Sequence, residues 1–157
     1  MTKRFKNAVD ALMYAFFNET LAKGTCSACA VGTMVAWGAG VKVGKCLEPV
    51  YISDLVTNDL WGMAFSTTDG IQSRDYKKEK EWFVKICIKE TGYSADELAR
   101  IEYVFDTNTE IHYKNYSGHT KQEIMEDQYK GLSAVMDVLC EIEMIQDPAS
   151  YKKLFVV

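Results

Sequence analysis

The strongest structural signal in the chain lies between Thr120 and Glu143, where the sequence reads TKQEIMEDQYKGLSAVMDVLCEIE. Thr120 and Glu123 have the spacing of a capping box, in which a hydroxyl and a carboxylate each bind a free backbone N–H at a helix start. The residues that then share one apolar stripe are Ile124, Gln128, Leu132, Val135, Leu139 and Ile142. We therefore predict a long core helix from about Lys121 to Glu143.

The same periodicity and capping signals predict five helices upstream. Gly24 is expected to stop the first of them, Thr25 or Ser27 to cap the second, and Ser94 with Glu97 to form another capping box. The predicted ranges are 2–22, 26–37, 53–65, 74–91 and 94–105. Because the chain has only two prolines and no linker-like segment, we expect a mainly α fold, a single compact domain over residues 1–157 with about six helices.

Two short segments have a β-prone composition instead. Residues 41–52 alternate well enough to form a strand or an extended connection, and residues 153–157 end in Leu-Phe-Val-Val. We expect these two segments to pair as a small two-stranded β element.

Composition excludes several classes of partner. The chain has 157 residues and a net charge of -4, with 22 acidic and 18 basic side chains. Because proteins that bind nucleic acid concentrate basic residues on one face, we do not expect nucleic acid as a partner. No run of about 20 strongly apolar residues is present, so no membrane span is expected. With five cysteines and no export signal, we predict a reduced, cytoplasmic protein.

The helix predicted over residues 26–37 carries a stripe of small side chains. Ala28, Gly32 and Ala36 are four residues apart, a spacing that lets another helix approach closely. A homo-oligomer joined through this helix is one arrangement that the stripe would allow.

Two groups of residues have the chemistry of metal ligands. Cys26 and Cys29 form a C-x-x-C pair at a helix start, although a second pair of ligands for zinc is missing from the sequence. Glu123, Glu126 and Asp127 provide carboxylates on adjacent helical turns, as an octahedral magnesium site requires. Their spacing resembles the E-x-x-E half of the all-α nucleoside-triphosphate pyrophosphohydrolases, but no glutamate here is followed three residues later by an aspartate, as that family's second half requires.

Aromatic side chains and helix starts suggest a pocket for a small anion. Helix N-termini bind anions through free backbone amides, and nine tyrosines and three tryptophans could line such a pocket. The candidate residues are Thr25, Ser27, Trp37, His112, Tyr113, Tyr116 and His119. The dinucleotide and P-loop fingerprints are absent, so no cofactor is predicted.

These observations support three hypotheses about function. The first is a small soluble, non-enzymatic binding or accessory protein whose ligand is a partner protein or a small anionic metabolite or nucleotide. The alternatives are a metal-dependent nucleotide pyrophosphohydrolase-like enzyme that uses the three acids, and a structural thiol-metal module at Cys26 and Cys29.

Overall fold

A computed structural model of the chain describes residues 1–24, 28–40 and 74–156. These residues form six α-helices and two short 3-10 helices, and the chain is mainly α, as the sequence predicts. The elements are α1 (Lys3–Phe17), α2 (Ala30–Gly38), α5 (Arg74–Thr91), α6 (Ala95–Asn108), η1 (Tyr113–Gly118), α7 (Lys121–Ile142), α8 (Pro148–Lys152) and η2 (Lys153–Phe155). Among the described helices, none is both long and apolar enough to cross a membrane.

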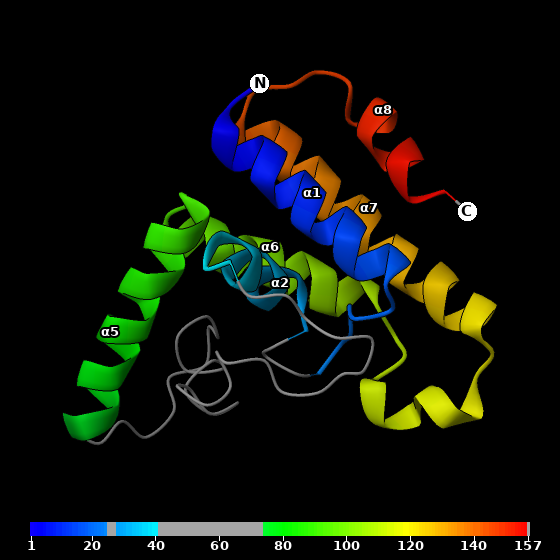
Figure 1. Cartoon of the computed structure of the whole chain (residues 1–157), viewed down its shortest axis with the longest axis horizontal. Coiled ribbons are helices and arrows are strands. Elements are labelled where there is room, and N and C mark those ends of the chain that lie inside the picture. The colour runs from blue at the N-terminus through cyan, green and yellow to red at the C-terminus, as the bar shows by residue number, and fades with distance from the viewer. Residues whose placement is uncertain (25–27, 41–73, 157) are drawn as a thin grey trace.

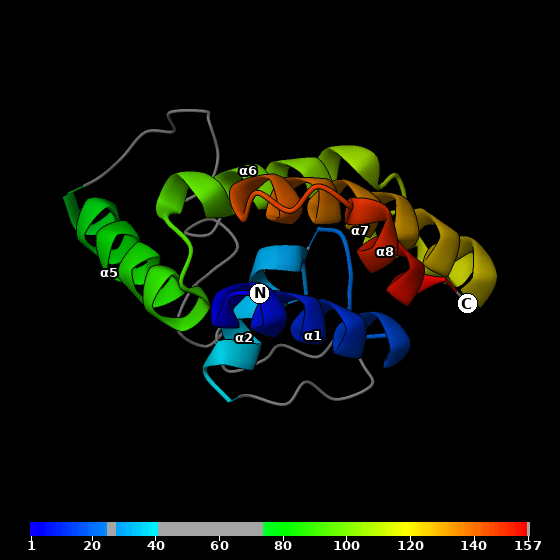
Figure 2. The same cartoon turned by 90° about the horizontal axis from the view of Figure 1, so that it is seen from above.

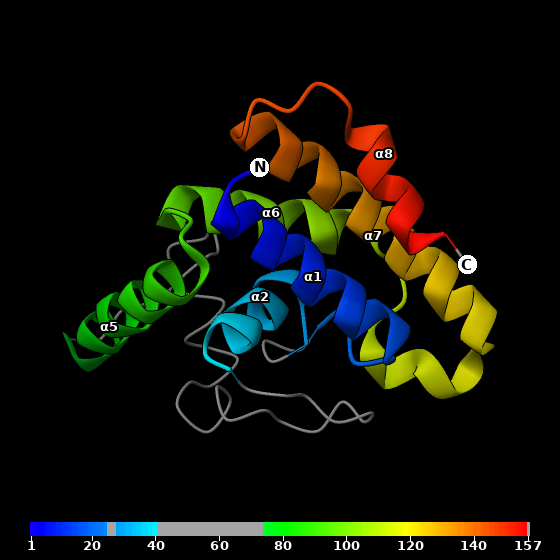
Figure 3. The same ribbon diagram turned by 45° about the horizontal axis from the view of Figure 1, so that its top comes forward.

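The helices pack in two layers around a shared core. α6 and α7 make the most extensive pairing and lie together in one layer, while α1 and α2 form the other (Figure 1 and Figure 2). The short α2 contacts α1, α5 and α6, which places it in the middle of the fold. α5 stands at one end of the molecule, and the carboxy-terminal α8 and η2 lie at the other, with α8 packed on α7 (Figure 3).

The long helix predicted from Lys121 is confirmed as α7. The Thr120 hydroxyl accepts a hydrogen bond from the Glu123 N–H over 3.2 Å, which is the hydroxyl half of the predicted capping box. Gly131 lets α6 approach closely, because a Cβ at this position would lie 2.6 Å from Thr109 Cγ2 and 2.8 Å from the Phe105 ring.

α5 and α6 also follow their local sequence signals. α5 has the predicted bounds and is followed by Gly92, whose φ of +78° favours glycine. The capping box of Ser94 and Glu97 is complete, with both reciprocal hydrogen bonds present. α6 continues to Asn108, three residues beyond the predicted end, with Leu98, Ile101 and Phe105 fully buried on one face.

The predicted end of the first helix is wrong. α1 ends at Phe17 rather than at residue 22, because Glu19 adopts a left-handed conformation with φ of 60°. The Thr20 N–H then donates to the Ala15 carbonyl over 2.9 Å, and the Glu19 N–H donates to the Phe16 carbonyl over 3.4 Å. These bonds form a Schellman motif in which a glutamate occupies the position usually taken by glycine.

The predicted start of the second helix is also wrong, since α2 begins at Ala30 instead of residue 26. Cys29 is its N-cap, and its Sγ accepts a hydrogen bond from the Gly32 N–H over 3.3 Å. The predicted capping residues Thr25 and Ser27 lie outside the described residues. Every residue from Ala30 to Ala36 is buried within the chain, so α2 does not offer the surface that we expected to join a homo-oligomer.

The β element predicted at the carboxy terminus is not formed. Residues 153–155 form the 3-10 helix η2, which directly continues α8, and the Phe155 ring is buried in the core. Pro148 starts α8 at a position where its missing N–H costs no helical hydrogen bond. The proposed partner segment, residues 41–52, and the helix predicted over residues 53–65 lie outside the described residues.

Candidate functional site

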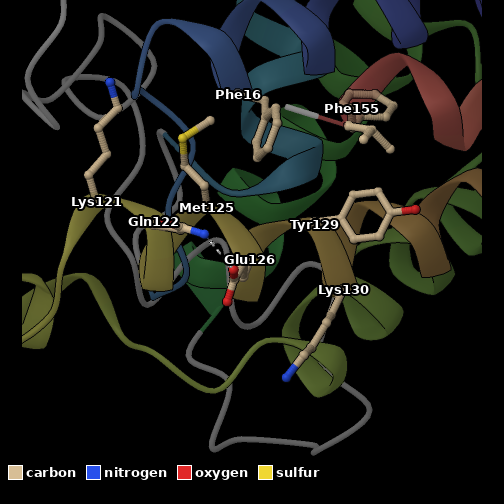
Figure 4. Close-up of a pocket in the computed structure, with 9 residues that line it drawn as sticks. Phe16, Lys121, Gln122, Met125, Glu126, Tyr129, Lys130 and Phe155 are labelled. Carbon is tan, nitrogen blue, oxygen red and sulfur yellow. Dashed lines mark hydrogen bonds between the residues drawn. The ribbon is translucent and has the colours of Figure 1, made fainter.

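A pocket of about 910 Å³ opens between the end of α1, the first half of α7 and η2 (Figure 4). This volume is within the usual range for sites that hold small molecules. The residues that line it are Phe16, Lys121, Gln122, Met125, Glu126, Tyr129, Lys130, Phe155 and Val156. Three segments distant in sequence therefore build one concave surface.

The wall of the pocket is aromatic and anchored in the core. The rings of Phe16 and Phe155 meet edge to face with their centroids 5.8 Å apart, and both side chains are almost fully buried. Met125 and Tyr129 project from successive turns of α7 and are partly buried against the same core. A wall held by core packing is preorganised, so a ligand does not have to order it on binding.

Two lysines stand on opposite flanks of this wall. Lys121 and Lys130 are nine residues apart on α7, which at about 100° per residue places them on opposite edges of the pocket face and about 13.5 Å apart along the helix. Lys121 Nζ lies 3.4 Å from the Glu19 carboxylate. Lys130 has no ion pair within the described part of the chain.

Among the described residues, Glu126 is the only carboxylate that lines the pocket. Its Oε1 accepts a hydrogen bond from the Gln122 side-chain amide over 3.1 Å, and the side chain is exposed. The formal charges of the described lining residues therefore sum to +1, from two lysines and one glutamate.

The other two predicted acidic ligands do not join Glu126. Asp127 is only 6% exposed, and its two oxygens accept hydrogen bonds from the backbone N–H groups of Glu110 (2.9 Å) and Ile111 (3.0 Å). Glu123 lies with Oε2 2.9 Å from His119 Nδ1, and hydrogen bonds from the His119 and Thr120 side chains lower its pKa. Among the described residues, no cluster of three or more His, Cys, Asp or Glu could hold a metal ion.

His112 and Tyr113, two of the predicted ligand-binding residues, attach the loop after α6 to the segment after α1. The Tyr113 N–H donates to the Lys23 carbonyl over 3.0 Å. The His112 and Tyr113 rings are tilted by 31° to each other, with their centroids 4.7 Å apart. A Cβ on Gly24 would lie 2.0 Å from His112 Nε2, so Gly24 is needed for this close approach as well as for its φ of +94°. The role predicted for Gly24, ending the first helix, is therefore wrong.

Tyr116 belongs to the same packing cluster. The Gln128 amide donates to the Tyr116 hydroxyl over 2.9 Å and to the Leu21 carbonyl over 2.5 Å. Burial raises the pKa of Tyr116. These two hydrogen bonds explain why a polar residue lies buried on the apolar stripe of α7: Gln128 links η1 to the segment that follows α1.

Trp37 has different neighbours from the histidine and tyrosine cluster. It lies near the end of α2, where its ring is 5.6 Å from that of Tyr14 and remains 39% exposed. Cys26, like Thr25 and Ser27, is outside the described residues, while Cys29 is buried at the α2 start. The predicted ligand-binding set is thus divided between packing positions, and its role in binding stays a prediction.

Glu102 is a notable polar residue that the sequence analysis missed. From α6 it reaches the first turn of α2, where its Oε2 accepts a hydrogen bond from the Val31 N–H over 3.3 Å. Burial raises the pKa of Glu102 to about 7, and hydrogen bonds with the Cys29 side chain and the Val31 N–H oppose this rise. No local signal distinguishes Glu102 from the solvent-facing acids of α6, because its partner comes from a distant helix.

No known protein family, no curated protein and no solved structure matches this chain.

Proposed function

We propose that this chain is a non-enzymatic binding protein that holds a small anionic ligand in the pocket on α7. The observation that carries the proposal is the pocket itself, with a volume of about 910 Å³, an aromatic wall fixed by the core and a lysine on each flank. Sites for small molecules commonly combine a mostly apolar lining with a few polar groups that orient the ligand.

The arrangement of the acids favours binding over magnesium-dependent hydrolysis. A site of that kind needs carboxylates that converge on one ion, together with phosphate-binding cations. Of the three predicted acids, Glu126 alone lines the pocket, whereas Asp127 accepts hydrogen bonds from two backbone amides and Glu123 is paired with His119. The hydrolase hypothesis would need further acids from residues beyond the described ranges.

The proposal can be tested by filling the pocket. Gln122 is exposed and lines the pocket, so Gln122→Trp should occupy the site without disturbing the core, and Gln146→Trp, at an exposed position outside the pocket, is the matched control. Unfolding temperatures would be measured with alkyl carboxylates, aryl carboxylates and nucleoside phosphates. A ligand present at ten times its Kd should stabilise the native protein by about 1.4 kcal/mol, or raise the midpoint by roughly 3–6 °C.

We expect at least one anion to raise the midpoint of the native protein and of Gln146→Trp, but not that of Gln122→Trp. Equal shifts in all three proteins, or no shift with any anion, would contradict the proposal. Release of phosphate from a nucleotide, abolished by Glu126→Gln, would instead support the hydrolase.

A further inference from the structure

The charges around the pocket narrow the class of ligand. In the part of the lining that the structure describes, two lysines and one glutamate give a net charge of +1, and one of the lysines, Lys121, already lies 3.4 Å from Glu19. A nucleotide would bring several negative charges next to Glu126, with too few cations to neutralise them. A monoanion matches this lining, because a single carboxylate can pair with one lysine.

The position of the cations indicates where that carboxylate would lie. Lys121 would have to exchange its contact with Glu19 for the ligand, whereas Lys130 has no acidic partner in the described ranges. Glu126 is one helical turn from Lys130, and its carboxylate is held by the Gln122 amide over 3.1 Å. An incoming anion would therefore be attracted by Lys130 and weakly repelled by Glu126.

The wall between the two lysines sets the size of the apolar part. From Lys130 back to Lys121 the helix advances about 13.5 Å, and the half-buried Met125 and Tyr129 side chains provide apolar surface between the two lysines, with the buried Phe16 ring behind them. An extended alkyl chain advances about 1.25 Å per carbon, given C–C bonds of about 1.5 Å. About ten carbons would therefore span the wall.

Resting on the proposed function, we propose that the ligand class is an amphipathic monocarboxylate with an apolar body about ten carbons long. Its carboxylate pairs with Lys130, and its apolar body lies against Met125 and Tyr129. Each methylene placed on the wall contributes about a fourfold gain in affinity, until the chain passes the end of the wall.

The experiment is isothermal titration of the purified full-length chain with linear carboxylates from hexanoate to tetradecanoate, all below their micelle concentrations. Affinity should rise about fourfold for each added carbon up to decanoate and then level off. Lys130→Met should weaken decanoate binding about fivefold to tenfold, and Glu126→Gln should strengthen it about twofold to fourfold. Lys114→Met, which removes an exposed lysine outside the pocket, is the charge-matched control and should change nothing.

Decanol separates the failure of this inference from the failure of the proposed function. If decanol binds as tightly as decanoate, or if Lys130→Met has no effect, the carboxylate assignment is overturned while binding in the pocket stands. If decanoate binds Gln122→Trp as tightly as it binds the native protein, the ligand lies elsewhere and both proposals fail. Absence of carboxylate binding, together with a dimer that Gln122→Trp dissociates, would show that a second copy occupies the pocket and would also overturn the inference.

Discussion

Replacing Glu102 by glutamine should remove a pH-dependent loss of stability. Glu102 reaches from α6 to the first turn of α2, and its carboxylate accepts a hydrogen bond from the Val31 N–H. The glutamine side-chain oxygen can accept the same bond, because it has almost the same shape and keeps the acceptor in place. The substitution therefore changes mainly the charge at the α2 start.

The magnitude follows from the raised pKa. Below pH 4.5 Glu102 is protonated in both the folded and the unfolded chain, so its charge costs nothing. Between pH 4.5 and about 7 the unfolded chain loses this proton first, and the native state is destabilised as the pH rises. At about 1.4 kcal/mol per pKa unit, the rise in the Glu102 pKa corresponds to a loss of about 3 kcal/mol in the free energy of unfolding. Since the Glu102 side chain is only partly buried, we expect a loss of about 2 kcal/mol.

The assay is urea unfolding of the native protein and of Glu102→Gln, followed by far-ultraviolet circular dichroism at pH 5, 6, 7 and 8. The difference in unfolding free energy between the two proteins should grow by about 1.3 kcal/mol in favour of Glu102→Gln from pH 5 to pH 8, because the remainder of the effect is complete by pH 5. Glu126→Gln, which removes an exposed acid, should show no such growth. A difference that stays constant with pH, or that grows in favour of the native protein, would refute the role assigned to Glu102.

Three further substitutions test the packing around α7 and α6 by the same unfolding assay. Asp127→Ala leaves two loop amides without their acceptor and should lower the free energy of unfolding by about 3 kcal/mol. Glu126→Ala should change it by no more than about 0.5 kcal/mol, and equal losses in the two variants would contradict the structural role of Asp127. Gly131→Ala should lower the free energy of unfolding by about 1–2 kcal/mol, since overpacking against α6 outweighs the gain in helix propensity. Gly118→Ala, where a Cβ would meet open space, should leave it unchanged. A more stable Gly131→Ala variant would refute the close contact between α6 and α7. Tyr93→Phe should be neutral or slightly stabilising, because the buried Tyr93 hydroxyl has no hydrogen-bond partner among the described residues, and a loss above about 1 kcal/mol would reveal a partner there.

The sequence predicted those helix ends that depend on neighbouring residues. Ser94 with Glu97, Thr120 and Gly92 act within one turn of the helix that they start or end, so their effect can be inferred from local spacing. Glu19 takes the left-handed position after α1 without being a glycine, and Met144 does the same after α7 with φ of 58°. Both side chains are exposed, and neither residue type favours this conformation, so local propensity gives no helix stop at Glu19 and the end of α1 was misplaced.

Gly24 is a second residue whose role could not be predicted from its neighbours in sequence. Its position after an apolar periodic stretch predicts a helix stop, but the structure requires glycine there because the His112 ring approaches from 88 residues further along the chain. A contact of this range leaves no mark in local sequence. The same is true of Glu102, whose partners at the α2 start come from a distant segment.

The candidate pocket was not foreseen for a related reason. Lys121 and Lys130 have the pattern of ordinary solvent-facing residues on an amphipathic helix, and Phe16 and Phe155 have that of ordinary core residues. Only the packing of η2 beside the end of α1 converts these residues into the lining of one cavity. The β-prone composition of residues 153–157 predicted a strand instead. In the structure these apolar residues do not pair as a strand, and the 3-10 helix η2 buries Phe155 in the core.

The acidic residues of α7 show how helical geometry separates functions that sequence spacing groups together. Glu126 and Asp127 are adjacent in sequence, but the step of about 100° between them turns Glu126 towards the pocket and Asp127 towards the loop after α6. Removing Asp127 should therefore release the loop, whereas removing the charge of Glu126 should leave the fold intact and change only the affinity for an anion. Because the two residues differ in what they contact, the unfolding free energy and the binding constant should respond independently, and a variant that altered both together would contradict this division.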